Sequence, residues 1–319
     1  MAMGKLRSWR PRWALGPVMV LGFLMAVSGL ARAQEIEPNE FVPAPNGTNL
    51  NLAYYLHGSN TSFVSTSGHT IPNSNLDVNL GLERYVHYTY VGGMPAGFQV
   101  YEVFGSESGG RVGGRGLGST FGASSPALSA FIWPYASTEK KQYLVFTGFL
   151  YPPVGSYDKN KSLNIAPALS GSEGWVGDVQ VGWDQGIGDH FSYDAALDGR
   201  FSADTTNPIQ PGVPLSVRSH KDIELRAQLW LNWAWTRAFQ TSIGYEGLFG
   251  GNTYFDNPLA LGGRGHTNTG SSRVDRLRAA ASMFLSQRFQ VLLEVNHDLN
   301  RTGGFKQEFG LNLRALYIF

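Results

Sequence analysis

The sequence predicts an all-β protein, a transmembrane antiparallel β-barrel of about twelve strands with both termini on the periplasmic side. Three observations lead to this prediction: a leader for export, segments of alternating polarity about every twenty residues, and connections that alternate between long and short. Outer-membrane barrels join such strands by short periplasmic turns on one side and longer outer loops on the other.

The N-terminus has the parts of a cleaved secretory signal. Basic residues precede an apolar run over Ala14–Val27, and Ala31-Arg32-Ala33 supplies a small-residue cleavage site before Gln34. The run is short for a spanning helix and is interrupted by Gly and Pro. We therefore predict a signal peptide over residues 1–33, a flexible periplasmic lead-in rich in Pro, Asn and Glu over residues 34–47, and a barrel over residues 48–319.

Period-two alternation predicts the strands, because successive side chains of a strand point to opposite faces. In the stretch after His220, for example, Leu225 and Leu229 alternate with Glu224 and Gln228. The apolar set is expected to face lipid and the polar set the lumen. The predicted strands are Asn49–Gly58, Val78–Val91, Gly97–Gly105, Gly122–Tyr135, Lys141–Pro152, Trp175–Gly186, Asp189–Ser202, His220–Ala234, Arg237–Gly250, Ser272–Ser286, Phe289–Asn300 and Phe305–Phe319.

The last predicted strand ends on aromatic residues. Tyr317 and Phe319 share a face with the apolar residues of Phe305–Phe319, a pattern that resembles the closing strand recognised by the barrel-assembly machinery. We predict these two residues as the assembly signal. Other aromatic residues gather near strand ends, where their rings suit the headgroup level of outer-membrane lipid and lipopolysaccharide.

Composition narrows the class further. The chain has 40 Gly, 13% aromatic and 15% charged residues and no Cys. Without residues 1–33, acidic residues outnumber basic ones, so we expect no nucleic-acid partner. The absence of Cys means that burial and hydrogen bonding alone must hold an exported chain together.

No motif in the sequence predicts an enzyme or a cofactor. The glycine run from Gly109 to Gly118 lacks the Gly-Lys-Ser/Thr ending of a phosphate loop, so it is interpreted as a flexible outside loop carrying Arg111 and Arg115. The seven His residues show no metal-binding spacing. A barrel hydrolase is an alternative class, but no Ser nucleophile motif supports it.

Charged residues of both signs fall on the predicted inner faces. They are expected either to lace a packed interior with ion pairs or to line a narrow polar path or binding pocket. The lumen-lining candidates are Asp178, Asp194, Asp198, Arg200, Glu224, Arg226, Glu246, Arg276, Arg278, Glu294, Glu308 and Arg314.

Three short motifs resemble a known family. Arg84-Tyr85, the segment Pro153-Val154-Gly155-Ser156-Tyr157-Asp158, and Phe191-Ser192-Tyr193-Asp194 are similar to those of outer-membrane proteins assigned to the MetA pathway of phenol degradation. The resemblance implies an outer-membrane channel or transporter, often encoded with degradation of aromatic compounds. It implies no catalytic residues.

The functional hypothesis is passive uptake of small hydrophobic or aromatic solutes. Aromatic residues expected in the outer loops would capture the solute before it enters the lumen; these candidates are Phe63, Tyr157, Tyr254 and Phe255. The alternative is an occluded barrel with a structural or adhesive role and no transport.

Overall fold

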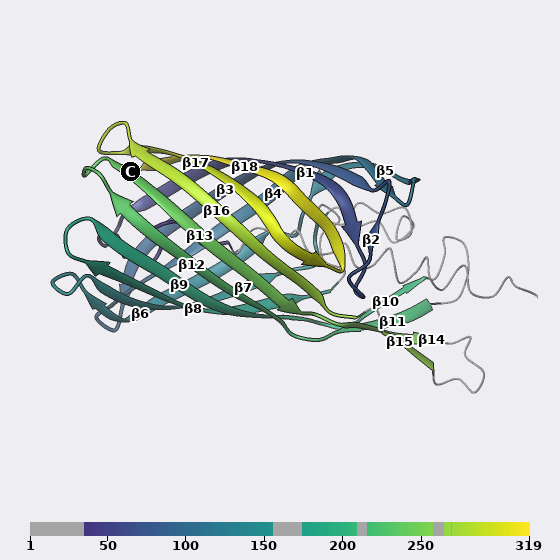
Figure 1. Ribbon diagram of the computed structural model, residues 1–319. Helices are drawn as coiled ribbons and strands as arrows, with labels where there is room; N and C mark the ends of the chain where they lie inside the picture. Colours follow the sequence, from purple (N-terminus) through teal and green to yellow (C-terminus); the bar gives the residue numbers. More distant parts are fainter. Residues whose placement is uncertain (1–34, 156–173, 209–215, 258–264, 269) are drawn as a thin grey trace, which may run out of the picture.

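The computed structural model describes residues 35–155, 174–208, 216–257, 265–268 and 270–319 (Figure 1). The predicted signal peptide lies outside these residues. Nowhere in these ranges does the chain form a helix long and apolar enough to cross a membrane.

Twelve long strands of the described chain close into one antiparallel barrel, which confirms the predicted fold (Figure 1). The last strand pairs with the first, from Leu50 opposite Ile318 to Val64 opposite Gly304. Closure removes the free edges, whose backbone groups would otherwise stay unsatisfied in hydrocarbon. The strands are β1 (Asn49–Val64), β3 (Asn75–Val91), β4 (Met94–Val112), β6 (Ala127–Ser137), β7 (Gln142–Tyr151), β8 (Val176–Ile187), β9 (Phe191–Ser202), β12 (Glu224–Ala234), β13 (Phe239–Gly250), β16 (Ser272–Phe284), β17 (Phe289–Thr302) and β18 (Gly304–Ile318).

The two ends of the barrel differ in their connections. At one end the strands are joined by short turns, such as Gly92–Gly93 between β3 and β4. Long connections lie at the other end, except that Gly303 alone joins β17 to β18. Asn49 and Phe319 exchange backbone N–H···O bonds of 3.0 Å, so the first strand begins and the last strand ends together at the short-turn end.

The glycine run is a β-hairpin, so its interpretation as a flexible loop is wrong. β5 (Arg115–Ala123) pairs with the extended end of β4, beginning with Val112 opposite Arg115. Gly113 and Gly114 have φ angles of 60° and 79°. Two successive residues with positive φ form the two-residue turn whose twist matches a hairpin. Gly122 belongs to β5, and the predicted strand Gly122–Tyr135 therefore starts several residues too early.

A second sheet extends beyond the barrel at the long-connection end (Figure 1). Its four strands are β10 (Thr205–Pro208), β11 (Ser216–Lys221), β14 (Thr253–Asn257) and β15 (Gly265–Asn268). The short β2 (Thr70–Ile71) pairs with the end of β1. The predicted strand His220–Ala234 is thus divided, because its first residues belong to β11 and the remainder to β12.

The barrel wall follows the expected alternation over most of its circumference. In β12, Leu225, Leu229 and Leu231 are exposed on the outside, while Glu224 and Arg226 are buried on the inside. β3 and β4 differ. They carry apolar side chains on the inner face as well, such as Leu80 and Val103, and Glu83 lies directly opposite Glu102 on the outer face.

Candidate functional site

The lumen of the barrel has two chemically different walls. The apolar wall is formed by the inward side chains of β1, β3, β4, β6 and β7, which are mostly aliphatic and aromatic; they include Leu52, Leu56, Leu76, Val78, Leu80, Leu82, Val86, Tyr88, Tyr101, Val103, Phe131, Trp133, Tyr143, Val145, Phe149 and Tyr151. The charged wall is formed by β8, β9, β12, β13, β16, β17 and β18. Buried carboxylates and guanidinium groups predominate there.

Arginine side chains organise the charged wall. Arg276 Nε donates to Asp298 Oδ1 at 2.7 Å, and Arg278 binds both carboxylate oxygens of Glu294 at 2.8 and 2.9 Å. The guanidinium group of Arg278 also lies 4.6 Å from the ring centroid of Trp230. Buried ion pairs add little net stability because desolvation offsets their attraction. They do, however, fix the positions of the groups that face the lumen.

Residues 35–47 form the interior segment: residues 35–41 lie largely inside the barrel, and residues 42–47 lead from there toward β1. Its buried part corrects the prediction of a flexible periplasmic lead-in. Ile36 and Phe41 have exposed fractions of only 2% and 4%. The backbone N–H of Ile36 donates to Gln228 Oε1 at 2.9 Å. Its carbonyl oxygen accepts hydrogen bonds from Trp230 Nε1 at 2.9 Å and from Arg278 Nη1 at 3.1 Å. The backbone is thus held by the charged wall.

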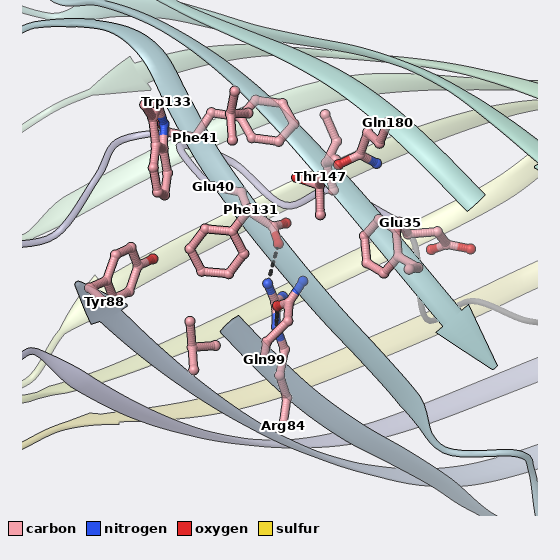
Figure 2. Close-up of a pocket in the computed structure, with 14 residues that line it drawn as sticks. Glu35, Glu40, Phe41, Arg84, Tyr88, Gln99, Phe131, Trp133, Thr147 and Gln180 are labelled. Atoms are coloured by element: carbon pink, nitrogen blue, oxygen red, sulfur yellow. Dashed lines mark hydrogen bonds and ion pairs between the residues drawn. The ribbon is translucent and has the colours of Figure 1, made fainter. Parts of the chain in front are cut away.

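Each glutamate of the interior segment faces an arginine of the barrel. Glu35 lies 3.3 Å from Arg276 and 3.6 Å from Arg278. Glu37 pairs with Arg314 of β18. On the apolar wall, Glu40 pairs with Arg84 at 2.5 Å (Figure 2). Ion pairs to three places on the barrel therefore anchor a segment without secondary structure of its own.

A tight turn shapes the interior segment between Glu37 and Glu40. The N–H of Glu40 donates to the carbonyl oxygen of Glu37 at 3.2 Å, and Asn39 has a φ of 60°. Pro followed by Asn suits such a turn, because Pro presets one φ and Asn tolerates a positive one. The N–H of Asn39 then donates to Asp194 Oδ2 at 2.9 Å.

The aromatic ring of Phe41 in the interior segment packs against the barrel wall at β8. Trp133 Nε1 donates to the carbonyl oxygen of Phe41 at 2.8 Å, and both side chains line the same cavity (Figure 2). The ring lies over Gly182 of β8, where an added Cβ would come within 2.5 Å of it. A cavity of about 30 Å³ remains beside it, lined by residues of the interior segment, the apolar wall and Gln180.

The structure places every predicted lumen candidate on the inner face except Glu308. Asp178, Asp194, Asp198, Arg200, Glu224, Arg226, Glu246, Arg276, Arg278, Glu294 and Arg314 belong to the charged wall. Glu308 was assigned to the lumen wrongly. Its side chain is 38% exposed, beside Lys306 and the outward His297, because the pairing register shifts where Ser59 and Asn60 meet β18.

The loop-capture candidates are not brought together. Phe63 lies in β1, only 2% exposed, and packs edge-on against Phe305 with ring centroids 5.1 Å apart, so its assignment to a loop is wrong. Tyr254 lies in β14 beside His220, and Phe255 is its neighbour in the same strand. Tyr157 lies outside the described residues. Tyr317 and Phe319 stack on the outside of the barrel, with their ring centroids 6.1 Å apart.

Sequence reasoning missed the interior segment and the apolar wall. One signal was present: Leu76, Val78, Leu80 and Leu82 alternate with polar residues, but their register places them inside. The interior segment has no periodicity. Its partners are recognisable only in the folded chain, as with Ile36 and Gln228, which are 192 positions apart.

The closed barrel, its largely apolar exterior and its filled lumen define a membrane-spanning β-barrel of the outer-membrane class. The chain belongs to the family described as "Putative MetA-pathway of phenol degradation", which it matches over residues 59–315. This match confirms the family resemblance seen in the sequence. No curated protein matches the chain.

A solved structure of an outer-membrane channel shares the barrel architecture. The COG4313 outer membrane channel from Pseudomonas putida F1 is 23% identical, with a TM-score of 0.77, over 89% of this chain and 100% of that chain. Two others have lower TM-scores. The transport unit of the autotransporter AIDA-I from Escherichia coli has a TM-score of 0.48 and 9% identity, over 93% of this chain and 96% of that chain. The Ralstonia pickettii toluene transporter TbuX has a TM-score of 0.44 and 11% identity, over 86% of this chain and 90% of that chain.

Proposed function

We propose that the protein is an outer-membrane channel for passive uptake of small hydrophobic or aromatic compounds. The apolar wall carries this proposal, because the inward side chains of β3 form an apolar row from Leu76 to Leu82, which continues beyond the paired Arg84 with Val86 and Tyr88. Water-filled porins have polar interiors. An apolar row along one side of the lumen instead offers a solute repeated contacts that replace water.

The location and topology are part of the same proposal. Residues 1–33 would direct export and be removed before Gln34, and both chain ends would lie in the periplasm. Short turns at the end where Asn49 meets Phe319 support this orientation, since short turns face the periplasm in barrels of this class. Tyr317 and Phe319 would be read by the barrel-assembly machinery, with lipid and lipopolysaccharide around the outer face. We propose transport rather than catalysis.

Uptake of labelled phenol and toluene by Gram-negative cells tests the proposal, with and without the chain. Cells that carry it should accumulate both compounds faster. The Val86→Asn variant should slow uptake several-fold, because it places an amide on the apolar wall. Val100→Asn is the matched control, since Val100 is 41% exposed on the outside of β4. Equal uptake with and without the protein would refute transport.

An occluded structural or adhesive barrel is the second candidate. The interior segment favours it, because only about 30 Å³ remains beside Phe41. Planar-bilayer recording separates the two functions. A folded barrel that never conducts, even when the interior segment is deleted, would support the structural role.

A further inference from the structure

We infer that the place occupied by Phe41 is a binding site for a single aromatic ring, and that an aromatic solute competes with Phe41 for it. This inference deepens the proposed function and rests on it. The site, called the ring seat below, consists of Gly182 under the ring, Val145 opposite Gly182 in the sheet, and Trp133, which lines the same cavity and donates to the backbone carbonyl of Phe41.

The ring seat differs from the other places where an aromatic ring covers a glycine. Phe104 covers Gly81, Phe131 covers Gly97, Phe201 covers Gly177 and Trp230 covers Gly244, but each of these rings comes from the neighbouring strand and is part of the wall. Phe41 comes from the interior segment, which forms no strand and is held around Phe41 by contacts with side chains of the barrel. Its ring can therefore leave without opening the barrel sheet.

The volume of the cavity decides whether a solute ring binds next to Phe41 or takes its place. The cavity beside Phe41 measures about 30 Å³. A dry protein cavity that accepts benzene has a volume of about 150 Å³. A second ring consequently cannot enter while Phe41 is in place, whereas departure of the phenyl group leaves a space of matching shape.

A hydrogen-bond donor at the ring seat selects among aromatic compounds. Trp133 is 3% exposed, and its Nε1 donates to the carbonyl oxygen of Phe41. An indole N–H can only donate, and a buried donor without a partner is costly. A solute that displaces Phe41 should therefore carry an acceptor, as a phenol oxygen does. We expect phenol to bind about tenfold more tightly than toluene, given the usual cost of an unsatisfied group.

Displacement of Phe41 links binding to the state of the lumen. The interior segment is fixed at its far end by the N–H of Gly47, which donates to the carbonyl oxygen of Tyr88 at 2.9 Å. When a solute takes the ring seat, the segment loses both its aromatic contact and the Trp133 hydrogen bond. The solute thereby favours the state in which the segment has moved aside.

Calorimetric titration of the full-length Phe41→Ala barrel with phenol tests the site. The variant should bind phenol at least tenfold more tightly than the wild-type protein, whose own ring competes. The nitrogen-15 indole signal of Trp133 should shift on binding. Phe305→Ala is the matched control, since it removes a phenyl group at 6% exposure far from Trp133 and should gain no such affinity. In the otherwise unchanged protein, where binding requires the segment to move aside, Trp133→Phe should abolish the preference for phenol over toluene.

Equal affinity of Phe41→Ala and wild-type barrels for phenol would overturn the ring seat, as would a Trp133 signal that does not move. Phe41 lies outside the strands, and retained heat-modifiable migration in electrophoresis verifies that the barrel has folded. Gly182→Val provides a second variant, since its side chain fills the seat and should abolish phenol binding. Uptake of phenol by cells separates the two proposals. If Phe41→Ala binds phenol tightly but the cells take up no phenol, transport alone is refuted. If the cells take up phenol but Phe41→Ala does not bind it more tightly, the ring seat alone is refuted.

Discussion

Trp230 Nε1 donates a hydrogen bond to the carbonyl oxygen of Ile36 at 2.9 Å, across 194 positions of sequence. Trp230 has an exposed fraction of 0%, and the guanidinium group of Arg278 lies over its ring. The contact fastens the interior segment to the charged wall in the middle of β12.

Replacing Trp230 by Phe should loosen the interior segment. The substitution removes one hydrogen bond, worth about 1 kcal/mol, while Arg278 still donates to the same oxygen. The population with the segment displaced should rise about fivefold, visible as more frequent openings in single-channel recordings. Trp233→Phe is the control, because Trp233 is 45% exposed outside the same strand. Identical records from both variants would contradict the anchoring role.

Breaking the Glu40–Arg84 ion pair should release the segment on the apolar wall. Glu40→Gln leaves a half-buried guanidinium group without its carboxylate, at a cost of about 1.5–3 kcal/mol. Amide exchange over residues 35–47 should accelerate accordingly, and a double-mutant cycle with Arg84→Met should show coupling. Lys141→Met provides the control, because its pair with Asp189 is exposed and worth little. Additive effects of Glu40→Gln and Arg84→Met would show that the ion pair does not hold the segment.

The outward pair of Glu83 and Glu102 should destabilise the barrel in lipid. Like charges directly opposite each other on neighbouring strands repel, and charges on the lipid face are unfavourable. Glu102→Leu should raise the free energy of unfolding by on the order of 1 kcal/mol, measured by urea titration in vesicles. Glu294→Leu should instead lower it, since Arg278 loses a two-point contact. A loss of stability in Glu102→Leu would indicate that a partner covers this face.

Acidification should loosen the exposed sheet at Asp204. Hydrogen bonds from His220 and Arg218 lower the pKa of this aspartate below its ordinary value. A lowered folded-state pKa means that the stabilisation is present above the ordinary aspartate pKa and is lost as the pH falls through the lowered one. The protection of backbone amides of β10 and β11, taken relative to the intrinsic exchange rate at each pH, should thus be equal at pH 7 and pH 5 and lower near pH 3. Asp204→Asn should remove this difference.

The barrel could be predicted from the sequence because its determinants are local. Alternation in β12 and β13 and the lengths of the connections identify strands without knowledge of their partners. The hairpin at Gly113–Gly114 is also encoded locally, as a glycine pair between two extended stretches, although the glycine content of the run suggests a loop.

The contents of the lumen depend on contacts that alternation does not encode. Glu37 and Arg314 are joined across 277 positions, and neither carries a local sign of the other. In β3, the two-residue period was visible, but the assumption that apolar residues face lipid gave the wrong direction for Leu80 and Glu83. Register within the closed barrel, rather than polarity, decides which face points inward.

The three glutamates of the interior segment also determine which ions an opened barrel admits. When the segment is seated, Glu35, Glu37 and Glu40 neutralise arginines on both walls. Withdrawal of the segment takes three negative charges out of the lumen and leaves those arginines in place. The conducting state is therefore more electropositive than the closed state, and its reversal potential in a salt gradient should shift toward that of the anion.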